Sequence, residues 1–244
     1  MNPFSSTPRN FRLLAAFAHP DDEAYGPSGT LKAVVDAGAR VRIVIATRGE
    51  AASLGMSREY PPGQLARIRQ AELQASAGIL GAELAILGYP DKGVEAVGPG
   101  TAVAALVREI RQFHPDILLT FHPNGLSGHS DHLAMTEYVN LAFAAAADPA
   151  YRPDLGAAWR TGRVYYFAIS QTQAALLAQS RRILCIPDGE SDLALDVHPW
   201  LATKHRACQA HTTQLAFYQL LAGAEGGLDA YWGIEHLVLR TSDD

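Results

Sequence analysis

The sequence has few of the features that mark secreted, membrane-spanning or nucleic-acid-binding proteins. Its 244 residues include only two cysteines, Cys185 and Cys208, too few for the disulfide framework of a small secreted domain. Its apolar runs fall well short of the roughly 20 residues that cross a bilayer, and the N-terminus lacks a secretion-signal pattern. The net charge of −5 offers no basic surface for nucleic acid. We therefore expect a cytoplasmic protein with neither a membrane span nor a nucleic-acid partner.

What the sequence does contain favours one large α/β domain. Apolar residues make up 48% of the chain, and a chain of this length can bury about three quarters of its unfolded surface. Short apolar runs typical of strands alternate with longer amphipathic runs, the pattern of βαβ units and a parallel sheet. We expect a single domain over residues 1–244 with a Rossmann-like, three-layer α/β/α fold and a mostly parallel sheet. Its core would span about 12–150, and a smaller strand-and-helix part about 160–244.

Four strand–helix repeats are predicted in the first 150 residues. The expected strands cover 11–18, 41–47, 83–88 and 116–122, and the expected helices cover 29–38, 64–80, 102–113 and 130–147. A fifth strand is predicted over 162–169, followed by a single helix over about 202–221.

The stretch HPDDE, residues 19–23, follows the first predicted strand. An acidic turn is usually a solvated helix cap. His19 favours another interpretation, because an imidazole nitrogen and a carboxylate three residues later can bind one first-row metal ion. Ligands of open α/β sheets bind at the carboxyl ends of strands, where this segment lies.

A second cluster follows the fourth predicted strand, in the stretch TFHPNGLSGHSDH. It contains His122, His129 and His132, with Gly125 and Gly128 permitting tight turns. Two strand-end loops that each carry histidine and aspartate can meet over one sheet edge. Three ligands with open coordination positions are typical of a catalytic metal site, whereas a structural zinc site is closed by four ligands.

These motifs, together with TRGEA, RIRQAELQASAGILGA and GYPD, resemble those of the LmbE-like, or PIG-L, family of zinc-dependent N-deacetylases, which act on N-acetylglucosaminyl conjugates. The resemblance covers residues 12–140. It continues more faintly through KHRACQAHTTQ, where Lys204, His211 and Gln214 match a C-terminal signature. It implies a small-molecule amino-sugar conjugate as substrate, acetate and a free amine as products, and a homo-oligomer, since family members are often trimers or hexamers.

The resemblance also implies roles for individual residues. His19, Asp22 and His132 would bind Zn²⁺, with Fe²⁺ as the alternative ion. Asp21 would act as general base on water and then as general acid to the departing amine. His129 would help to hold the oxyanion of the tetrahedral intermediate.

Further residues match family positions around the site. Asp131 would orient a histidine by hydrogen bonding. Sugar contacts are implied for Glu50, Arg69 and Asp91, although each has an ordinary interpretation as a cap, a helix-surface residue paired with Glu72 and a turn residue, respectively. Ser127 departs from the family, because several members have an aromatic residue, often tyrosine, at this position.

Two other functions fit parts of the sequence. A non-haem Fe(II) oxygenase also uses two histidines and a carboxylate, but its first two ligands are commonly one residue apart on an all-β scaffold. A non-catalytic sugar- or nucleotide-binding protein could use a Rossmann-like frame, but HPDDEAYGPSG lacks the G-x-G-x-x-G fingerprint. The metal-dependent deacetylase explains both histidine clusters and is the function that we predict.

Overall fold

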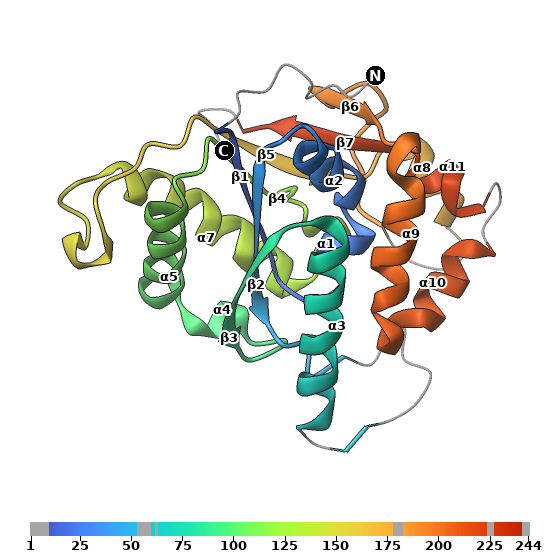
Figure 1. Cartoon of the computed structure of the whole chain (residues 1–244), viewed down its shortest axis with the longest axis horizontal. Helices are drawn as coiled ribbons and strands as arrows, with labels where there is room; N and C mark the ends of the chain where they lie inside the picture. Colours follow the sequence, from blue (N-terminus) through green and yellow to red (C-terminus); the bar gives the residue numbers. More distant parts are fainter. Residues whose placement is uncertain (1–9, 53–59, 62, 178–182, 224–226, 241–244) are drawn as a thin grey trace.

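A seven-stranded sheet between two helical layers forms the centre of the molecule (Figure 1). The computed structural model describes residues 10–52, 60–61, 63–177, 183–223 and 227–240, so the two ends of the predicted domain lie outside the described residues. The strands are β1 (Arg12–Phe17), β2 (Arg40–Thr47), β3 (Glu83–Tyr89), β4 (Ile117–Phe121), β5 (Arg163–Ala168), β6 (Leu193–Asp196) and β7 (Ile234–Leu239).

The strand order is β3-β2-β1-β4-β5-β7-β6. The first five strands in this order are parallel, and β7 pairs antiparallel with both β5 and β6. The prediction of a mostly parallel α/β sheet is therefore confirmed, with an antiparallel edge added by the C-terminal part. In β1 every residue after Arg12 is buried, as expected for a parallel strand covered on both faces.

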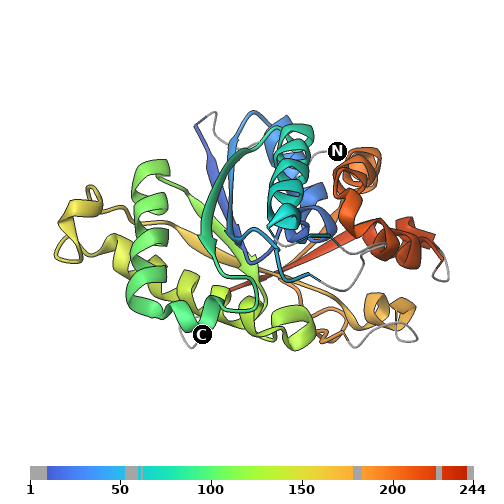
Figure 2. The same cartoon turned by 90° about the horizontal axis from the view of Figure 1, so that it is seen from below.

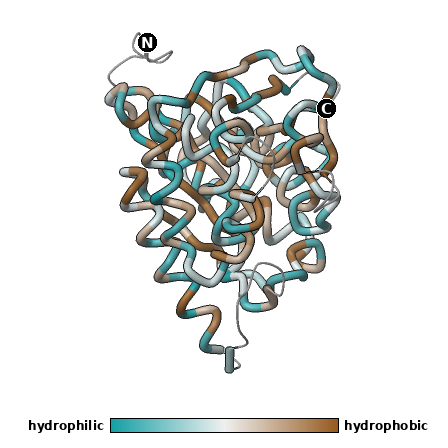
Figure 3. The backbone as a smooth tube through the Cα atoms, turned by 90° about the vertical axis from the view of Figure 1, so that its right-hand side faces the viewer, coloured by the Kyte–Doolittle hydropathy of each residue, from teal (hydrophilic) through white to brown (hydrophobic). Residues whose placement is uncertain are grey.

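Helices cover both faces of the sheet (Figure 2). On one face α5 (Pro99–Phe113) packs against α7 (Ser130–Ala147), and on the other α9 (Leu201–Ala210) packs against α2 (Ser28–Asp36) and α3 (Gln64–Leu80). Hydrophobic and hydrophilic residues alternate along the outer helices (Figure 3), as amphipathic helices require. The shorter helices are α1 (Asp22–Tyr25), α4 (Val94–Val97), α6 (Gly125–Gly128), α8 (Gln171–Leu177), α10 (Leu215–Ala222) and α11 (Gly227–Trp232), with 3₁₀ turns at Pro153–Leu155, His198–Trp200 and Thr212–Gln214.

Most predicted elements of the first 150 residues are confirmed with nearly the same boundaries, including α3 and α7. Gly81 caps the C-terminal end of helix α3 and adopts a left-handed conformation with φ 78° that glycine tolerates. Within the described residues, no helix combines the length and the apolar character needed to cross a membrane.

The single helix predicted over about 202–221 is wrong. It is interrupted at His211, whose ψ of 68° is not helical, and resumes as α10. The physical reason is that Glu72 of α3 accepts hydrogen bonds from the side chains of Thr212 and Thr213 and from the Thr213 N–H. These long-range hydrogen bonds stabilise a break in the helix, and the spacing of apolar residues along the chain cannot predict them.

The buried carboxylate of Glu235 links the C-terminal part of the chain to the start of α2. Lys204 of α9 lies 2.6 Å from a carboxylate oxygen of Glu235 on β7, and both are buried. Glu235 also accepts the N–H groups of Gly29 at 3.0 Å and Thr30 at 2.7 Å, at the start of α2. A Cβ at Gly29 would lie 2.6 Å from that of Val197, so this close approach requires glycine.

Strand order also explains where the two predicted clusters lie. Strand β1 pairs with β2 on one side and with β4 on the other, although β4 follows β3 in the chain. The loops after β1 and β4 therefore leave the same sheet edge in opposite directions, which is the usual position of a ligand site in such sheets.

Candidate active site

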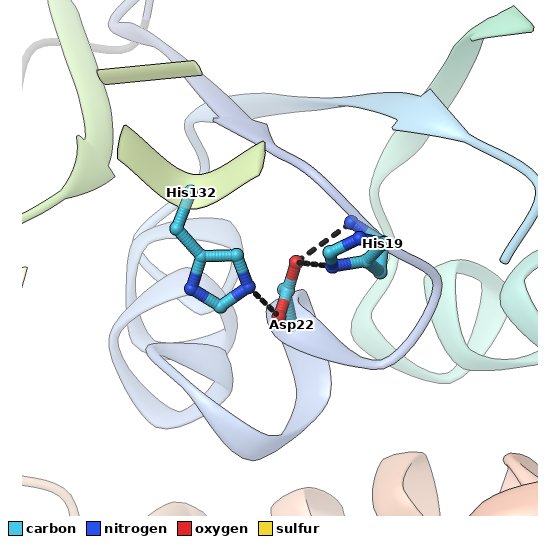
Figure 4. Close-up of side chains that lie close together, drawn as sticks. All are labelled: His19, Asp22 and His132. Atoms are coloured by element: carbon cyan, nitrogen blue, oxygen red, sulfur yellow. Dashed lines mark hydrogen bonds and ion pairs between the residues drawn. The ribbon is translucent and has the colours of Figure 1, made fainter. Parts of the chain in front are cut away.

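Three predicted metal ligands converge at this edge (Figure 4). His19 follows β1, Asp22 begins α1 and His132 lies in the first turn of α7. The Asp22 carboxylate lies between the two imidazoles, 3.5 Å from His19 Nδ1 and 3.4 Å from His132 Nε2. One ligand atom from each residue lies within 4.8 Å of the others, so the three could hold one ion.

The second nitrogen of each imidazole already has an acceptor. His132 Nδ1 lies 3.0 Å from the carbonyl oxygen of Gly125. His19 Nε2 lies 3.1 Å from Asp91 Oδ1 and 3.2 Å from Asp131 Oδ2. Outer partners of this kind fix the ring and the tautomer of metal-binding histidines. They leave His19 Nδ1 and His132 Nε2 turned towards Asp22.

A second group, His19, His129 and Asp131, also lies within 4.8 Å. Its carboxylate is more heavily committed, because Asp131 accepts the N–H groups of Lys92 at 2.7 Å and Val94 at 3.2 Å in addition to its contact with His19. The donor chemistry therefore favours the group that contains Asp22.

Burial and charge set the protonation of these groups. Burial disfavours a charged His132 and lowers its pKa to about 4, so at neutral pH this ring has the lone pair that a metal ligand needs. Burial also opposes charge on His19, but hydrogen bonds with Asp131, Asp22 and Asp91 outweigh it and raise the pKa of His19. The pKa of Asp22 is lowered, because His132 and His19 overcome the effect of burial on this carboxylate.

Asp21 lies beside the ligand group with an unusual backbone. Its φ of 113° is rare for a residue with a side chain, and its N–H donates to Glu23 Oε2 at 3.0 Å. Its carboxylate contacts Arg69 Nη2 at 3.0 Å. Burial raises the pKa of Asp21 to about 6, although Arg69 acts in the opposite direction. A carboxylate with this pKa can both accept and return a proton near neutral pH.

His19, Asp22 and His132 line a cavity, and Asp21 and Arg69 also lie in its wall. Arg69 is buried there and does not lie on the exposed surface of its helix. Besides Asp21, its guanidinium donates to the carbonyl oxygens of Gly49 at 3.0 Å and of Pro20. A Cβ at Gly49 would lie 2.5 Å from Arg69 Nη1. The alternative interpretation, a surface pair with Glu72, is therefore wrong for this residue.

Asp91 lines the cavity, whereas Glu50 does not. Asp91 Oδ2 accepts the Ala51 N–H at 2.8 Å, and its other oxygen faces His19. Glu50 is exposed and accepts the Asp91 N–H at 2.9 Å. Each of the two carboxylates therefore binds a backbone N–H of the other segment and stabilises the contact between the two loops. Of the two, only Asp91 could reach a substrate in this cavity.

His129 caps α7 at the cavity wall. Its Nδ1 accepts the Asp131 N–H at 3.2 Å, so the neutral ring carries its hydrogen on Nε2. Its ring lies 4.8 Å from that of His19 and 5.1 Å from that of His132. Burial and the neighbouring His19 lower the pKa of His129. Ser127, on the adjoining α6, also lines the cavity.

Sequence reasoning missed a buried network behind Asp21. Glu23 is fully buried and accepts from Ser76 Oγ at 2.6 Å and His211 Nε2 at 2.7 Å, in addition to the Asp21 N–H. Glu23 stands in the HPDDE motif, and His211 in the C-terminal signature. Both residues therefore lie in motifs that the sequence analysis identified, but nothing in the spacing of the two motifs predicts that Glu23 and His211 form a pair.

Comparison with known proteins identifies the family of the chain. The model of the PIG-L family, described as GlcNAc-PI de-N-acetylase, matches residues 14–143. A 1D-myo-inositol 2-acetamido-2-deoxy-alpha-D-glucopyranoside deacetylase of Geodermatophilus obscurus is 31% identical, over 84% of this chain and 83% of that protein. The protein of the same name from Rhodococcus erythropolis is 31% identical, over 93% and 90%.

Solved structures share the fold at lower identity. N,N'-diacetylchitobiose deacetylase from Pyrococcus horikoshii aligns with a TM-score of 0.71 and 20% identity, over 98% of this chain and 86% of that one. GalB, a 4-carboxy-2-hydroxymuconate hydratase from Pseudomonas putida, aligns with a TM-score of 0.69 and 19% identity, over 96% and 99%. A deacetylase and a hydratase thus share this fold, and the site must decide the chemistry. On the family match and the identity to curated relatives, the chain belongs to the PIG-L family of GlcNAc-PI de-N-acetylases.

Proposed function

We propose that the protein is a divalent-metal-dependent hydrolase that removes the N-acetyl group from an N-acetylglucosaminyl conjugate, giving acetate and a free amine. The observation that carries the proposal is the position of Asp21, a partly buried carboxylate with a pKa of about 6, beside a group of three side chains that could hold a metal ion. Curated relatives named for deacetylation of an N-acetylglucosaminyl inositol support the substrate class.

His19, Asp22 and His132 would hold the ion. Zn²⁺ is our first candidate and Fe²⁺ the second, because two imidazoles and one carboxylate suit both ions. A bound ion of this kind polarises a carbonyl and lowers the pKa of water. Asp131 would fix His19 through the contact at Nε2, which makes it a positioning residue.

Asp21 would carry both proton transfers. Its carboxylate accepts a proton from the attacking water and then gives it to the departing amine, which leaves as a neutral group. Arg69 orients this carboxylate by the contact at 3.0 Å. His129 donates from Nε2 to the oxyanion as charge develops there, since its Nδ1 is occupied as an acceptor. Removal of one such donor commonly costs about 3 kcal/mol in transition-state stabilisation.

Arg69 and Asp91 would contact the sugar at the cavity wall. Asp91 accepts one backbone bond and faces His19, and a carboxylate retains further acceptor sites for a hydroxyl. For Glu50 we now propose a supporting role, because its contact is with the backbone of Asp91. A cytoplasmic location and a trimeric or hexameric assembly remain predictions, which fractionation and light scattering can check.

The test combines metal analysis with product analysis. We expect the purified protein to contain about one divalent ion per chain, to release acetate and amine in equal amounts from an N-acetylglucosaminide, and to lose this activity on chelation. Added Zn²⁺ should restore it. Full activity without metal would overturn the proposal. Dioxygen uptake with Fe²⁺ and no acetate would favour the oxygenase, and sugar binding without turnover would favour the binding protein.

A further inference from the structure

We infer that the aglycone of the substrate, the group attached to the amino sugar, is apolar. This inference rests on the proposed deacetylase function and concerns the apolar residues among those that line the cavity. Polar and apolar residues line one cavity, and this difference in chemistry constrains which conjugates fit.

The cavity is lined by the polar residues described above and by a group of apolar residues. We call the second group the apolar wall. It is formed by aromatic and aliphatic side chains from α1, from the end of β5 and from the C-terminal helices α10 and α11, namely Tyr25, Phe167, Ile169, Phe217, Leu221 and Tyr231.

Aromatic side chains that line the cavity lie close to the metal-ligand group, in space or along the chain. Phe121, at the end of β4, stacks on the His132 ring with centroids 4.0 Å apart and planes inclined by 2°. Tyr25 lies three residues after Asp22, and its ring lies 5.1 Å from that of Phe217. The Tyr25 hydroxyl donates to the carbonyl oxygen of Gln214 at 3.2 Å, so this group is already hydrogen-bonded within the protein.

The apolar wall has little capacity to bind hydroxyl groups. Among the described residues that form it, none carries a charge. Next to it, Gln214 is a buried polar residue that also lines the cavity, and its Nε2, which has no hydrogen-bond partner within the described part of the chain, could donate to a hydroxyl oxygen but not to many. A polyhydroxylated aglycone placed here would lose water from many hydroxyls and regain few hydrogen bonds, which is unfavourable. An apolar aglycone loses only its unfavourable contact with water.

The apolar group must belong to the aglycone rather than to the acyl group. The acyl group released in the proposed reaction is acetyl, which is too small to cover aromatic side chains from three helices. The remaining part of the conjugate is the group linked to the sugar. An aryl or alkyl aglycone would therefore lie against Tyr25 and Phe217 while the acetamide faces Asp21.

The experiment uses the unmodified holoenzyme and four synthetic substrates. These are the phenyl, methyl and myo-inositol glycosides of N-acetylglucosamine, and the methyl glycoside of N-hexanoylglucosamine. We expect kcat/KM for the phenyl glycoside to exceed that for the methyl and inositol glycosides by at least about tenfold, the discrimination that even one methylene can give in an apolar pocket.

Equal values for the phenyl, methyl and inositol glycosides would overturn the inference and leave the proposed function intact. Preference for the N-hexanoyl substrate over the phenyl glycoside would also overturn it, because the apolar wall would then serve the acyl group. No turnover of any of the four would instead overturn the proposed function.

A variant pair locates the effect on the apolar wall. Phe217→Ala should reduce the ratio of kcat/KM for the phenyl glycoside to that for the methyl glycoside by about fivefold or more. Leu220→Ala is the matched control, because Leu220 lies on the same helix, is 47% exposed and does not line the cavity. An unchanged ratio in Phe217→Ala, with thermal unfolding like that of the control, would contradict the inference.

Discussion

The two parts of the chain contribute different things to one cavity. The βα repeats over residues 12–147 supply every side chain of the metal-ligand group and every group proposed to move a proton. The part over residues 163–240 adds two antiparallel strands and short helices, and supplies most of the apolar wall. If the proposals hold, the reaction and the sugar contacts depend on the first part, and the fit of the aglycone depends mainly on the second. Changes in the second part can alter the substrate without disturbing the reaction.

The largest expected effect is that of Asp21→Asn, which tests whether the first part of the chain carries the proton transfers. The amide keeps the shape of the carboxylate but cannot take a proton, so we expect kcat to fall by about 10²–10⁴ while the metal content stays unchanged. Metal analysis and kcat/KM measurements check this. Asp154→Asn is the control, since Asp154 is exposed, pairs with Arg152 at the surface and does not line the cavity. Loss of the ion, or activity within a few-fold of the parent, would show that the carboxylate roles are reversed.

Within the first part, His132 and His129 should separate metal binding from catalysis. His132→Ala removes a ligand and should abolish both metal content and activity, whereas His129→Ala should retain the ion and lose about 10²–10³ in kcat, as for a lost oxyanion donor. Metal analysis of both variants after the same desalting step is the measurement. Equal loss of metal would mean that His129 belongs to the ligand set.

In the second part, the largest effect should be on stability. Lys204→Met leaves the buried Glu235 carboxylate without its ion-pair partner, and breaking such a pair typically costs about 3–5 kcal/mol. Urea unfolding measures this cost. Adding Glu235→Gln to the same chain should recover part of it, because the uncompensated charge disappears. A loss for the single variant below 1 kcal/mol, near the value for an exposed pair, would contradict the buried geometry.

Asp91→Ala should show a smaller effect, in binding. If Asp91 mainly accepts a sugar hydroxyl, KM should rise about tenfold with little change in kcat, the signature of uniform binding. Initial rates over a range of methyl glycoside concentrations separate the two constants. A large fall in kcat at unchanged KM would place Asp91 in the chemistry, through its contact with His19.

The smallest expected effect is a pH dependence of stability. Burial opposes charge on His211, but Glu23 outweighs it and raises the pKa of His211 in the folded protein. Its contribution is therefore fully present below the unfolded pKa of about 6.5 and is lost as the pH rises through the raised folded pKa. His211→Gln should be destabilised most below this value and less at alkaline pH. Urea unfolding at several pH values tests this, and a deficit that grows with pH would exclude the assigned pair.

Much of the first part could be predicted because its information is local. The apolar runs of β1 and β2 and the periodicity of α3 and α7 specify their elements without reference to distant residues. The convergence of His19, Asp22 and His132 could also be predicted, because each follows a strand end within a recognisable motif.

The features that escaped prediction depend on contacts between distant segments. The break at His211 results from Glu23 and Glu72, which lie 188 and about 140 residues away in the chain. The helical period alone places Arg69 on the helix surface, and only the family resemblance placed it at the site; in the structure it is buried against Gly49. Glu235 is a charged residue in a buried position of β7, which interrupts the pattern of a strand. In each case a polar partner from another element overrides the local pattern.

The hydrogen bonds between Glu235 and the start of α2 join residues that are synthesised at different times. The N–H groups of Gly29 and Thr30 donate to the carboxylate of Glu235, which is synthesised more than 200 residues later. On the ribosome, the βα repeats therefore emerge with one helix start uncapped and with the apolar face beneath α9 uncovered. We expect the nascent chain to remain protease-sensitive until β7 leaves the exit tunnel, and chains terminated before Glu235 to be removed by cellular quality control.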